Sequence, residues 1–229
     1  TDAIGATISF GIGAGGAVSI NSLGGFTKAY VDQADIGMNP SWRVGNVKVL
    51  ADSQNFAEVR TISASGSFGI SLAGAYAEAT VDPEVIAYVS GDVNVSQDIS
   101  VTVTEVTNAV SEAKGFSFAP SVAVGVSLAR STVSPIVTAY VGGANTTIKA
   151  GSLSVTATQS YPTVDYSSKS SAAGSSAALI GVNATENTAK NTGIVTSYVA
   201  DHTMLSISDS IEISAVGDSN QRAEADSNN

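Results

Sequence analysis

The chain has 229 residues, of which 43% are hydrophobic and only 13% charged, with ten basic residues against twenty acidic ones. The formal net charge of -10 repels nucleic-acid phosphates, and the basic residues are too scattered to bind anionic lipid or heparin, so no nucleic-acid or membrane-surface partner is expected. No cysteine is present for a disulfide or thiolate metal site, and no apolar run approaches the roughly 20 residues of a membrane span.

The first predicted element is a run of small residues, Phe10 to Ile20, in which large residues alternate with glycine. We expect its large residues to pack as one apolar face, and its bare face to let another sheet or backbone approach closely. Tyr30 follows in the tripeptide Ala29-Tyr30-Val31. Next comes Val47 to Ala51, whose period-two alternation is typical of a strand with one buried face.

These three markers return in the same order three more times along the chain. Successive marker tyrosines, beginning with Tyr30, are separated by 58, 52 and 58 residues. The pattern predicts one module, 1–229, built from four diverged repeats of 52–58 residues near 1–64, 65–116, 117–170 and 171–229. The later markers are Phe68 to Ala79, Tyr88 and Ile99 to Val103; Val122 to Leu128, Tyr140 and Leu153 to Ala157; and Ala177 to Val182, Tyr198 and Ile211 to Ala215.

Turn signals follow the later tyrosines, at Ser90-Gly91-Asp92, Gly142 to Asn145 and Ala200-Asp201-His202, and helical periodicity is absent. The sequence therefore predicts an all-β, elongated parallel β-solenoid or β-helix, with a β-sandwich array as the alternative. At roughly 20 to 25 residues per coil, each repeat would make two or three coils. Successive tyrosines would then lie about 10 to 14 Å apart, too far for their rings to stack.

The clearest stretch, Ser121 to Thr158, contains Thr138-Ala139-Tyr140-Val141, a glycine turn, and Ala150 to Thr158. This pattern resembles the repeats of giant bacterial filamentous adhesins, including the leukotoxin-like adhesins, and the resemblance extends more weakly over all four repeats. It implies a long surface-exposed or secreted β-solenoid used in attachment or in an extracellular filament. Thr1-Asp2 is neither a signal peptide nor a translation start, so we expect the chain to be processed or an excerpt of a longer one.

Few residues suggest chemistry. The only histidine, His202, lies in a turn, where other repeats carry Ser90-Gly91 or Gly142-Gly143, and it lacks the partners of a nucleophile triad or a metal site. Two acidic pairs, Asp82 with Glu84 and Asp32 with Asp35, have the residue types of a glycosidase or an acidic calcium cluster, but each is read as solvating a strand end.

Three further motifs stand out in the sequence. Gly11 to Gly16 is glycine-rich, but a strand pattern follows it, so we reject a phosphate-binding loop. Gly37 to Arg43 has no counterpart in other repeats, and its Trp42, beside Pro40, is expected to be partly buried on the shaft, with a glycan or subunit contact as the alternative. The glycosylation sequons begin at Asn94, Asn145 and Asn183.

The sequence thus predicts a structural shaft module of a large bacterial surface or secreted adhesin-like protein, which projects or links other domains. A subunit of a self-assembling extracellular filament is the alternative, and a carbohydrate-active β-helix is a third hypothesis. We predict no enzyme activity, no catalytic, cofactor-binding or metal-binding residue and no cofactor. Expected partners are neighbouring repeats or identical subunits at both ends, and a host or cell-surface glycan or protein receptor.

Overall fold

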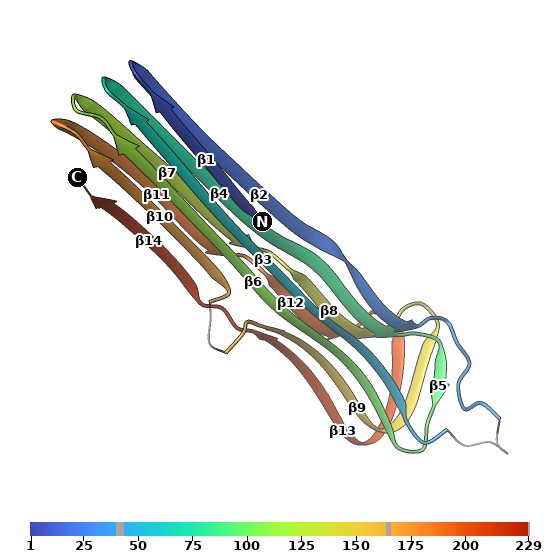
Figure 1. The fold of residues 1–229 in the computed structure, drawn as a ribbon. Helices are drawn as coiled ribbons and strands as arrows, with labels where there is room; N and C mark the ends of the chain where they lie inside the picture. The colour runs from blue at the N-terminus through green and yellow to red at the C-terminus, as the bar shows by residue number, and fades with distance from the viewer. Residues whose placement is uncertain (40–43, 164–165, 229) are drawn as a thin grey trace.

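The computed structural model describes residues 1–39, 44–163 and 166–228, and within these ranges it contains strands and no helix. All strand pairs are parallel, so the predicted all-β class with parallel strands is confirmed, in an arrangement of two sheets that is consistent with a β-helix-like winding. The long strands give the molecule the shape of a narrow blade (Figure 1).

The strands divide between two sheets that face each other. The first sheet, sheet A, contains β1 (Asp2–Ser9), β3 (Val47–Ser67), β5 (Asp92–Asn94), β6 (Asp98–Phe118), β9 (Thr146–Ser160), β10 (Ser168–Ala177), β13 (Thr203–Gly217) and β14 (Gln221–Asn228). The second, sheet B, contains β2 (Ile12–Val31), β4 (Ile70–Val89), β7 (Val122–Val133), β8 (Ile136–Val141), β11 (Ile180–Asn191) and β12 (Ile194–Val199).

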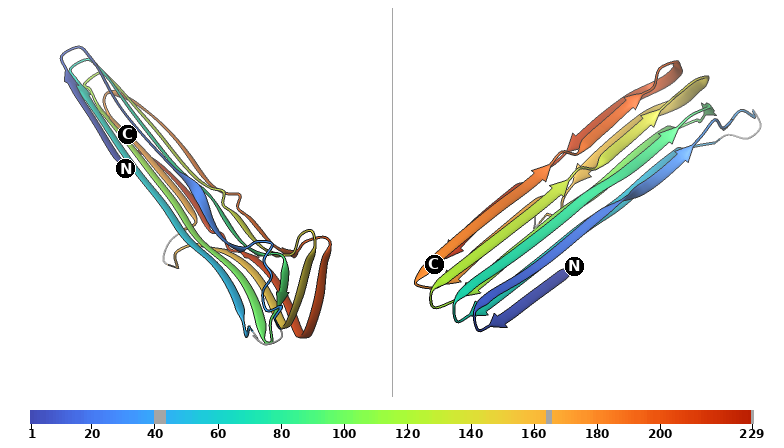
Figure 2. Two further views of the ribbon diagram at one scale, coloured as in Figure 1. Left: turned by 90° about the vertical axis from the view of Figure 1, so that its right-hand side faces the viewer. Right: turned by 90° about the horizontal axis from the view of Figure 1, so that it is seen from above.

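The chain passes from sheet A to sheet B and back once per repeat, so each repeat adds one layer to both sheets (Figure 2). The expectation of two or three coils per repeat is therefore wrong, and so is the wide spacing of the tyrosines. Both expectations fail because the strands are long. β3 and β4 contain 21 and 20 residues, so each strand alone is as long as a whole ordinary coil. Tyr30 pairs with Tyr88, and Tyr88 with Tyr140, in directly adjacent layers.

The small-residue runs bury their bare face, as expected, but their large residues are exposed instead of packed. Gly13, Ala17 and Ser19 of β2 point toward sheet A, whereas Ile12 and Val18 point outward. The two backbones lie too close for a large side chain between them. The predicted close approach of a second sheet is thus present, but the apolar bulk lies outside it.

Hydroxyl groups join the two sheets where they approach most closely. Thr61 of β3 donates to the carbonyl of Tyr76 in β4 at 2.9 Å, and Ser127 of β7 donates to the carbonyl of Ala173 in β10 at 2.8 Å. Such bonds satisfy side chains that are small enough to fit between closely packed sheets. Serine and threonine are therefore interior residues in this part of the blade.

The interior changes along the length of the strands. Around the end that carries the tyrosines it is filled by valine, isoleucine and leucine, including Ile99, Ile148 and Leu153. Toward the opposite end, where β1 turns into β2, alanine predominates, with Ala77 and Ala113 fully buried. The blade therefore narrows toward the β1–β2 turn because its interior side chains become smaller.

Two adjacent glycines of β2 test the close approach of the sheets. A Cβ added at Gly15 would lie 2.7 Å from the carbonyl oxygen of Ala64 in the opposite sheet, whereas one added at Gly16 would lie 3.9 Å from its nearest neighbour. We expect Gly15→Ala to lower the free energy of unfolding by about 1–3 kcal/mol through overpacking. Gly16→Ala is expected to change it by less than about 1 kcal/mol. Denaturant unfolding of both variants measures the difference, and equal effects would contradict the packing described.

Candidate functional site

The acidic pairs occupy separate surface positions. Asp82 and Glu84 point outward from β4, on either side of the inward-facing Pro83. Asp32 follows the end of β2. The Asp32 carboxylate accepts a hydrogen bond from the Ser90 hydroxyl at 2.9 Å, which links it to the next layer. Within the described ranges no three histidine, cysteine or acidic side chains are grouped as metal ligands.

His202 lies in an exposed turn with a positive φ of 61°. The pairing of Thr203 with Thr146 places it level with Asn145, whose φ is 59°, rather than with the glycines of that turn. His202 therefore occupies a left-handed turn position that Asn145 fills in the preceding layer, and this backbone geometry accounts for its place without a chemical role.

The glycine-rich run and the sequons lie in strands and turns of the structure. Gly13 to Gly16 lie within strand β2, so this segment has no phosphate-cradling loop geometry. Trp42 and Pro40 lie outside the described residues. Among the sequons, Asn94 and Asn145 are exposed, whereas the Asn183 side-chain oxygen is buried close to Gly125, so only the first two asparagines are open to a glycan.

The four marker tyrosines form a continuous stack across the layers. Successive ring centroids are 5.3, 4.8 and 5.2 Å apart, and the ring planes lie within 9° of one another. The ammonium group of Lys28 lies 5.1 Å from the centroids of both Tyr30 and Tyr88. Burial raises the pKa of Tyr140, with smaller contributions from Tyr88, Tyr198 and Asp32. Because most ring faces cover one another, this row stabilises the stack and offers little free aromatic surface.

A polar line crosses the interior between its two apolar parts. Ser53, Glu105 and Gln159 occupy the same position in three successive layers. Glu105 is fully buried and accepts a hydrogen bond from the Asn55 amide at 2.9 Å, while its second carboxylate oxygen has no partner in the described part of the chain. Burial raises the pKa of Glu105 against the opposing hydrogen bonds from Asn55 and Ser53.

Ion pairs also connect successive layers. Arg60 and Glu112 lie 2.9 Å apart on sheet A, and Arg130 and Glu186 lie 3.2 Å apart on sheet B. Lys114 pairs with the same Glu112. Burial alone would raise the pKa of Glu112, but these two cations lower it. Exposed pairs of this kind add little stability, and they favour the observed register because opposite charges meet across the layers.

Both ends of the stack carry strands with one neighbour. At the first layer, β1 pairs with β3 and β2 pairs with β4. At the last, β14 pairs with β10 and β13 with β9 on sheet A, and β11 pairs with β7 and β12 with β8 on sheet B. The opposite edges of these strands are unpaired among the described residues, so their backbone groups can accept another parallel strand. These two edges are the candidate functional surfaces. The sequence predicts partners at both ends of the module, but not the row of stacked tyrosines.

No family model, curated protein or solved structure matches the chain. The described residues contain no helix that is long and apolar enough to cross a membrane.

The buried carboxyl group of Glu105 makes stability depend on pH. Since the pKa of Glu105 is raised in the folded state, the folded chain binds this proton more tightly than the unfolded chain does. The contribution of Glu105 to stability therefore falls as pH rises above 4.5, the pKa of the group in the unfolded chain. Glu105→Gln removes the charge and places at this position the residue that Gln159 supplies in the next layer. We expect the variant to be more stable than the parent by about 1–2 kcal/mol at pH 7, and equal to it near pH 4. Urea unfolding at both pH values measures this; a pH-independent difference would contradict it.

The tyrosine row predicts a graded response to substitution. Tyr88 has rings on both sides and is 7% exposed, whereas Tyr30 ends the row and is 57% exposed. We expect Tyr88→Ala to cost about 3 kcal/mol in the free energy of unfolding, and Tyr30→Ala less than about 1 kcal/mol. Tyr88→Phe keeps the stacked ring and serves as the matched control in denaturant unfolding. Similar losses for the two alanine variants would show that ring stacking contributes little.

Proposed function

We propose that the chain is a structural module of a parallel β-solenoid, in which each of four repeats forms one layer of a longer stack. The observation that carries this proposal is the register. Equivalent residues of successive repeats pair with each other on both sheets, so the same surface is presented at every layer. A further layer that pairs with β1 and β2 at one end, or with β11, β12, β13 and β14 at the other, would satisfy the free edges by the same pattern of bonds.

The proposed setting is a large bacterial surface or secreted adhesin-like protein, in which the module links or projects other domains outside the cell. This setting is supported by the resemblance of the repeats to those of filamentous adhesins. The proposed partners are the neighbouring repeats or identical subunits at each end, with a host or cell-surface glycan or protein receptor bound elsewhere. No catalytic activity, cofactor or metal is part of the proposal.

A second candidate is a filament subunit, in which separate copies of the chain stack edge to edge. The presence of free parallel edges at both ends favours it, because head-to-tail stacking of identical chains produces an open filament. A carbohydrate-active β-helix has less support, since Asp82 and Glu84 are not accompanied by a free aromatic platform: the marker tyrosines stack on one another.

Electron microscopy of the native material that contains this chain tests the proposed stack. We expect a continuous ribbon whose layers repeat about every 4.8 Å, so that these four repeats advance it by about 19 Å. Layers that continue unbroken into neighbouring covalent repeats would support the shaft module. Particles whose strand edges are covered by a domain of another fold would contradict it.

An edge substitution distinguishes the shaft from the filament. The Asn220 carbonyl accepts from the Ser167 amide of the adjoining layer, so the amides of alternate residues, including Ala223, point to the free edge of β14. If separate chains form the filament, sedimentation will detect association that rises with concentration, and Ala223→Pro will abolish it. Glu224→Pro is the control. The amide that it removes points toward β10 rather than to the free edge, so this substitution lowers the stability of the chain itself.

A further inference from the structure

Charged residues are missing from the narrow end of the blade. The four turns between sheet A and sheet B lie at this end, and the strand segments that lead into and out of them carry no lysine, arginine, aspartate or glutamate. We call this region the apolar tip. It consists of residues 3–19, 61–77, 115–129 and 170–185. On the last layer of sheet A, β14 borders this region and carries Glu224 and Asp226, level with Ser171 and Ala173.

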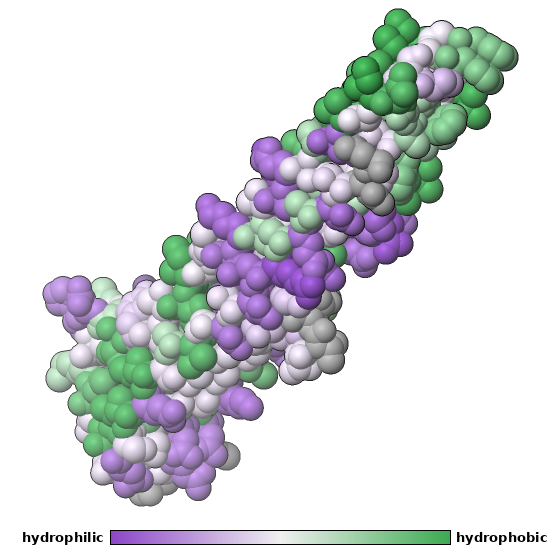
Figure 3. All heavy atoms as spheres, turned by 90° about the vertical axis from the view of Figure 1, so that its left-hand side faces the viewer, coloured by the Kyte–Doolittle hydropathy of each residue, from purple (hydrophilic) through white to green (hydrophobic). Residues whose placement is uncertain are grey.

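The apolar tip has its large apolar side chains on the outside. Phe10 and Leu179, in two of the turns, are 90% and 87% exposed. Apolar residues gather around this end in the space-filling view (Figure 3). On sheet B, one outward row crosses all four layers and is composed entirely of branched aliphatic residues: Ile12, Ile70, Val122 and Ile180.

The inner side of the apolar tip carries only small residues, in which alanines are mixed with serines. Ser63, Ser65, Ser71 and Ser117 are buried between the sheets. An ordinary soluble β-protein buries its large apolar residues and exposes its polar ones. The tip therefore has the reverse arrangement, and this arrangement is suited to an apolar surrounding medium.

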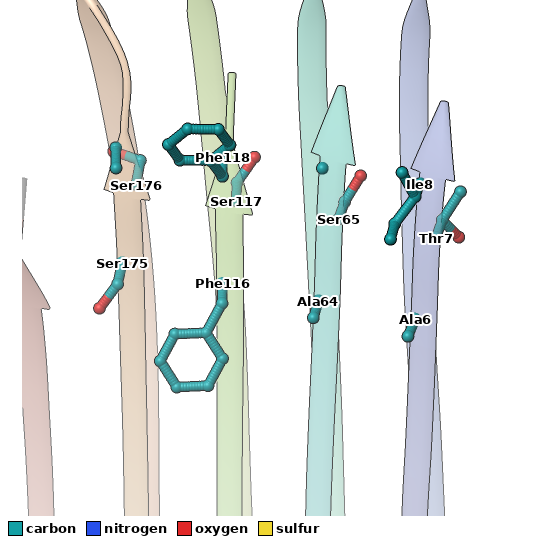
Figure 4. Close-up of a pocket in the computed structure, with 12 residues that line it drawn as sticks. Ala6, Thr7, Ile8, Ala64, Ser65, Phe116, Ser117, Phe118, Ser175 and Ser176 are labelled. Carbon is teal, nitrogen blue, oxygen red and sulfur yellow. The ribbon is translucent and has the colours of Figure 1, made fainter. Parts of the chain in front are cut away.

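A groove runs across the outer face of sheet A within the apolar tip. Its floor is formed by Ala64 and Gly66, and its sides by Ile8 on one layer and Phe116 and Phe118 on another (Figure 4). Its volume is about 540 Å³, and an adjoining apolar cavity of about 390 Å³ lies at the turns. Exposed, nearly charge-free cavities of this kind accommodate hydrocarbon rather than polar ligands.

A belt of charges marks where the apolar tip ends. Moving away from the turns, the first charged residue is a cation on several strands, such as Arg60, Lys114, Arg130 and Lys169. The belt contains both cations and anions, although the whole chain has twice as many acidic as basic residues. At about 3.3 Å per residue, these cations lie about 13 to 26 Å from the turns. One leaflet of a bilayer has about 15 Å of hydrocarbon.

From this arrangement we propose that the apolar tip inserts into the hydrocarbon of one leaflet of a lipid bilayer, with the charged belt among the head groups. A lipid layer surrounds an inserted end on both faces and over its turns at once. A second copy of the chain would cover one face and leave the other face and the turns in water. The distribution of apolar residues around the whole end therefore favours lipid over a protein partner.

The free edges of β1, β2, β11 and β14 segments set one condition. Unpaired strand edges are costly in hydrocarbon, so neighbouring layers that cover them favour insertion of the tip. To this extent the inference rests on the proposed stack. The sequence predicts no membrane-surface binding because it has no basic cluster. The inference depends on apolar surface, which charge alone does not report.

Flotation with phosphatidylcholine vesicles tests the proposal on the intact chain. We expect binding that changes little with salt. Phe10→Ser, Phe68→Ser and Phe118→Ser combined should weaken it at least a hundredfold, since burial of each ring contributes about tenfold or more. Phe26→Ser is the matched control, because Phe26 is 81% exposed but lies beyond the charge-free tip. Absence of binding by the parent chain, or equal losses in both variants, would overturn the proposal.

A fluorescent label identifies what covers the tip. The chain has no cysteine, so Ser121→Cys in a tip turn and Asp82→Cys beyond the belt can each carry one environment-sensitive dye. We expect the emission of the dye at 121 to shift to the blue when vesicles are added, and that of the dye at 82 to remain unchanged. A shift without lipid that grows with protein concentration would identify a second copy and overturn the proposal.

Sedimentation of the same samples separates this proposal from the proposed stack. Stacked chains that do not bind vesicles would overturn lipid insertion and leave the stack intact. Vesicle binding together with a blue shift of the dye at 121 supports insertion. If the chains in those samples sediment as single four-layer units, the result counts against the stack alone.

Discussion

The structure depends on how closely two parallel sheets can approach. In the narrow half of the blade the inner faces carry glycine, alanine and serine, and hydroxyl groups bond directly to carbonyls of the opposite sheet. No large side chain fits between them. The large residues that alternate with these small ones must therefore point outward, because neighbouring positions of a strand face opposite sides. The exposed apolar tip is thus a direct result of the close packing inside.

The stacking of equivalent residues imposes a second constraint. In a parallel, in-register stack each side chain lies beside its counterpart in the next repeat, so a residue must suit copies of its own position. Tyrosine does so by ring stacking. A buried carboxylate does not, and the line through Glu105 accordingly continues as Ser53 on one side and Gln159 on the other. Arg60 likewise meets Glu112 rather than another arginine.

Much of the fold could be predicted from the sequence because apolar and polar residues alternate along the strands. Ile99 to Val103 predicts a half-buried strand, and the recurring tyrosine predicts equivalent positions in repeats. The number of coils per repeat could not be predicted in this way. It depends on where strands end, and β4 runs through Pro83 without ending there. A proline that reads as a break thus lies within a 20-residue strand.

The candidate surfaces were predictable in part. Open edges follow from any stacked parallel fold, but the exposure of the large residues in the small-residue runs does not. Alternation of Ile12 with Gly13 indicates two unlike faces and a close approach of another sheet to the bare one, but it does not indicate that the face with the large residues stays exposed. That exposure depends on the distance between sheets, which is a property of the assembled pair and not of either segment.

The length of the strands has a mechanical consequence. A layer is about 70 Å broad along β3, whereas two packed sheets are only about 10 Å apart. A stack of such layers has the cross-section of a plank. It resists bending in the plane of its sheets and bends readily perpendicular to them, so a long assembly of these repeats would curve over a surface while keeping one edge turned in a constant direction.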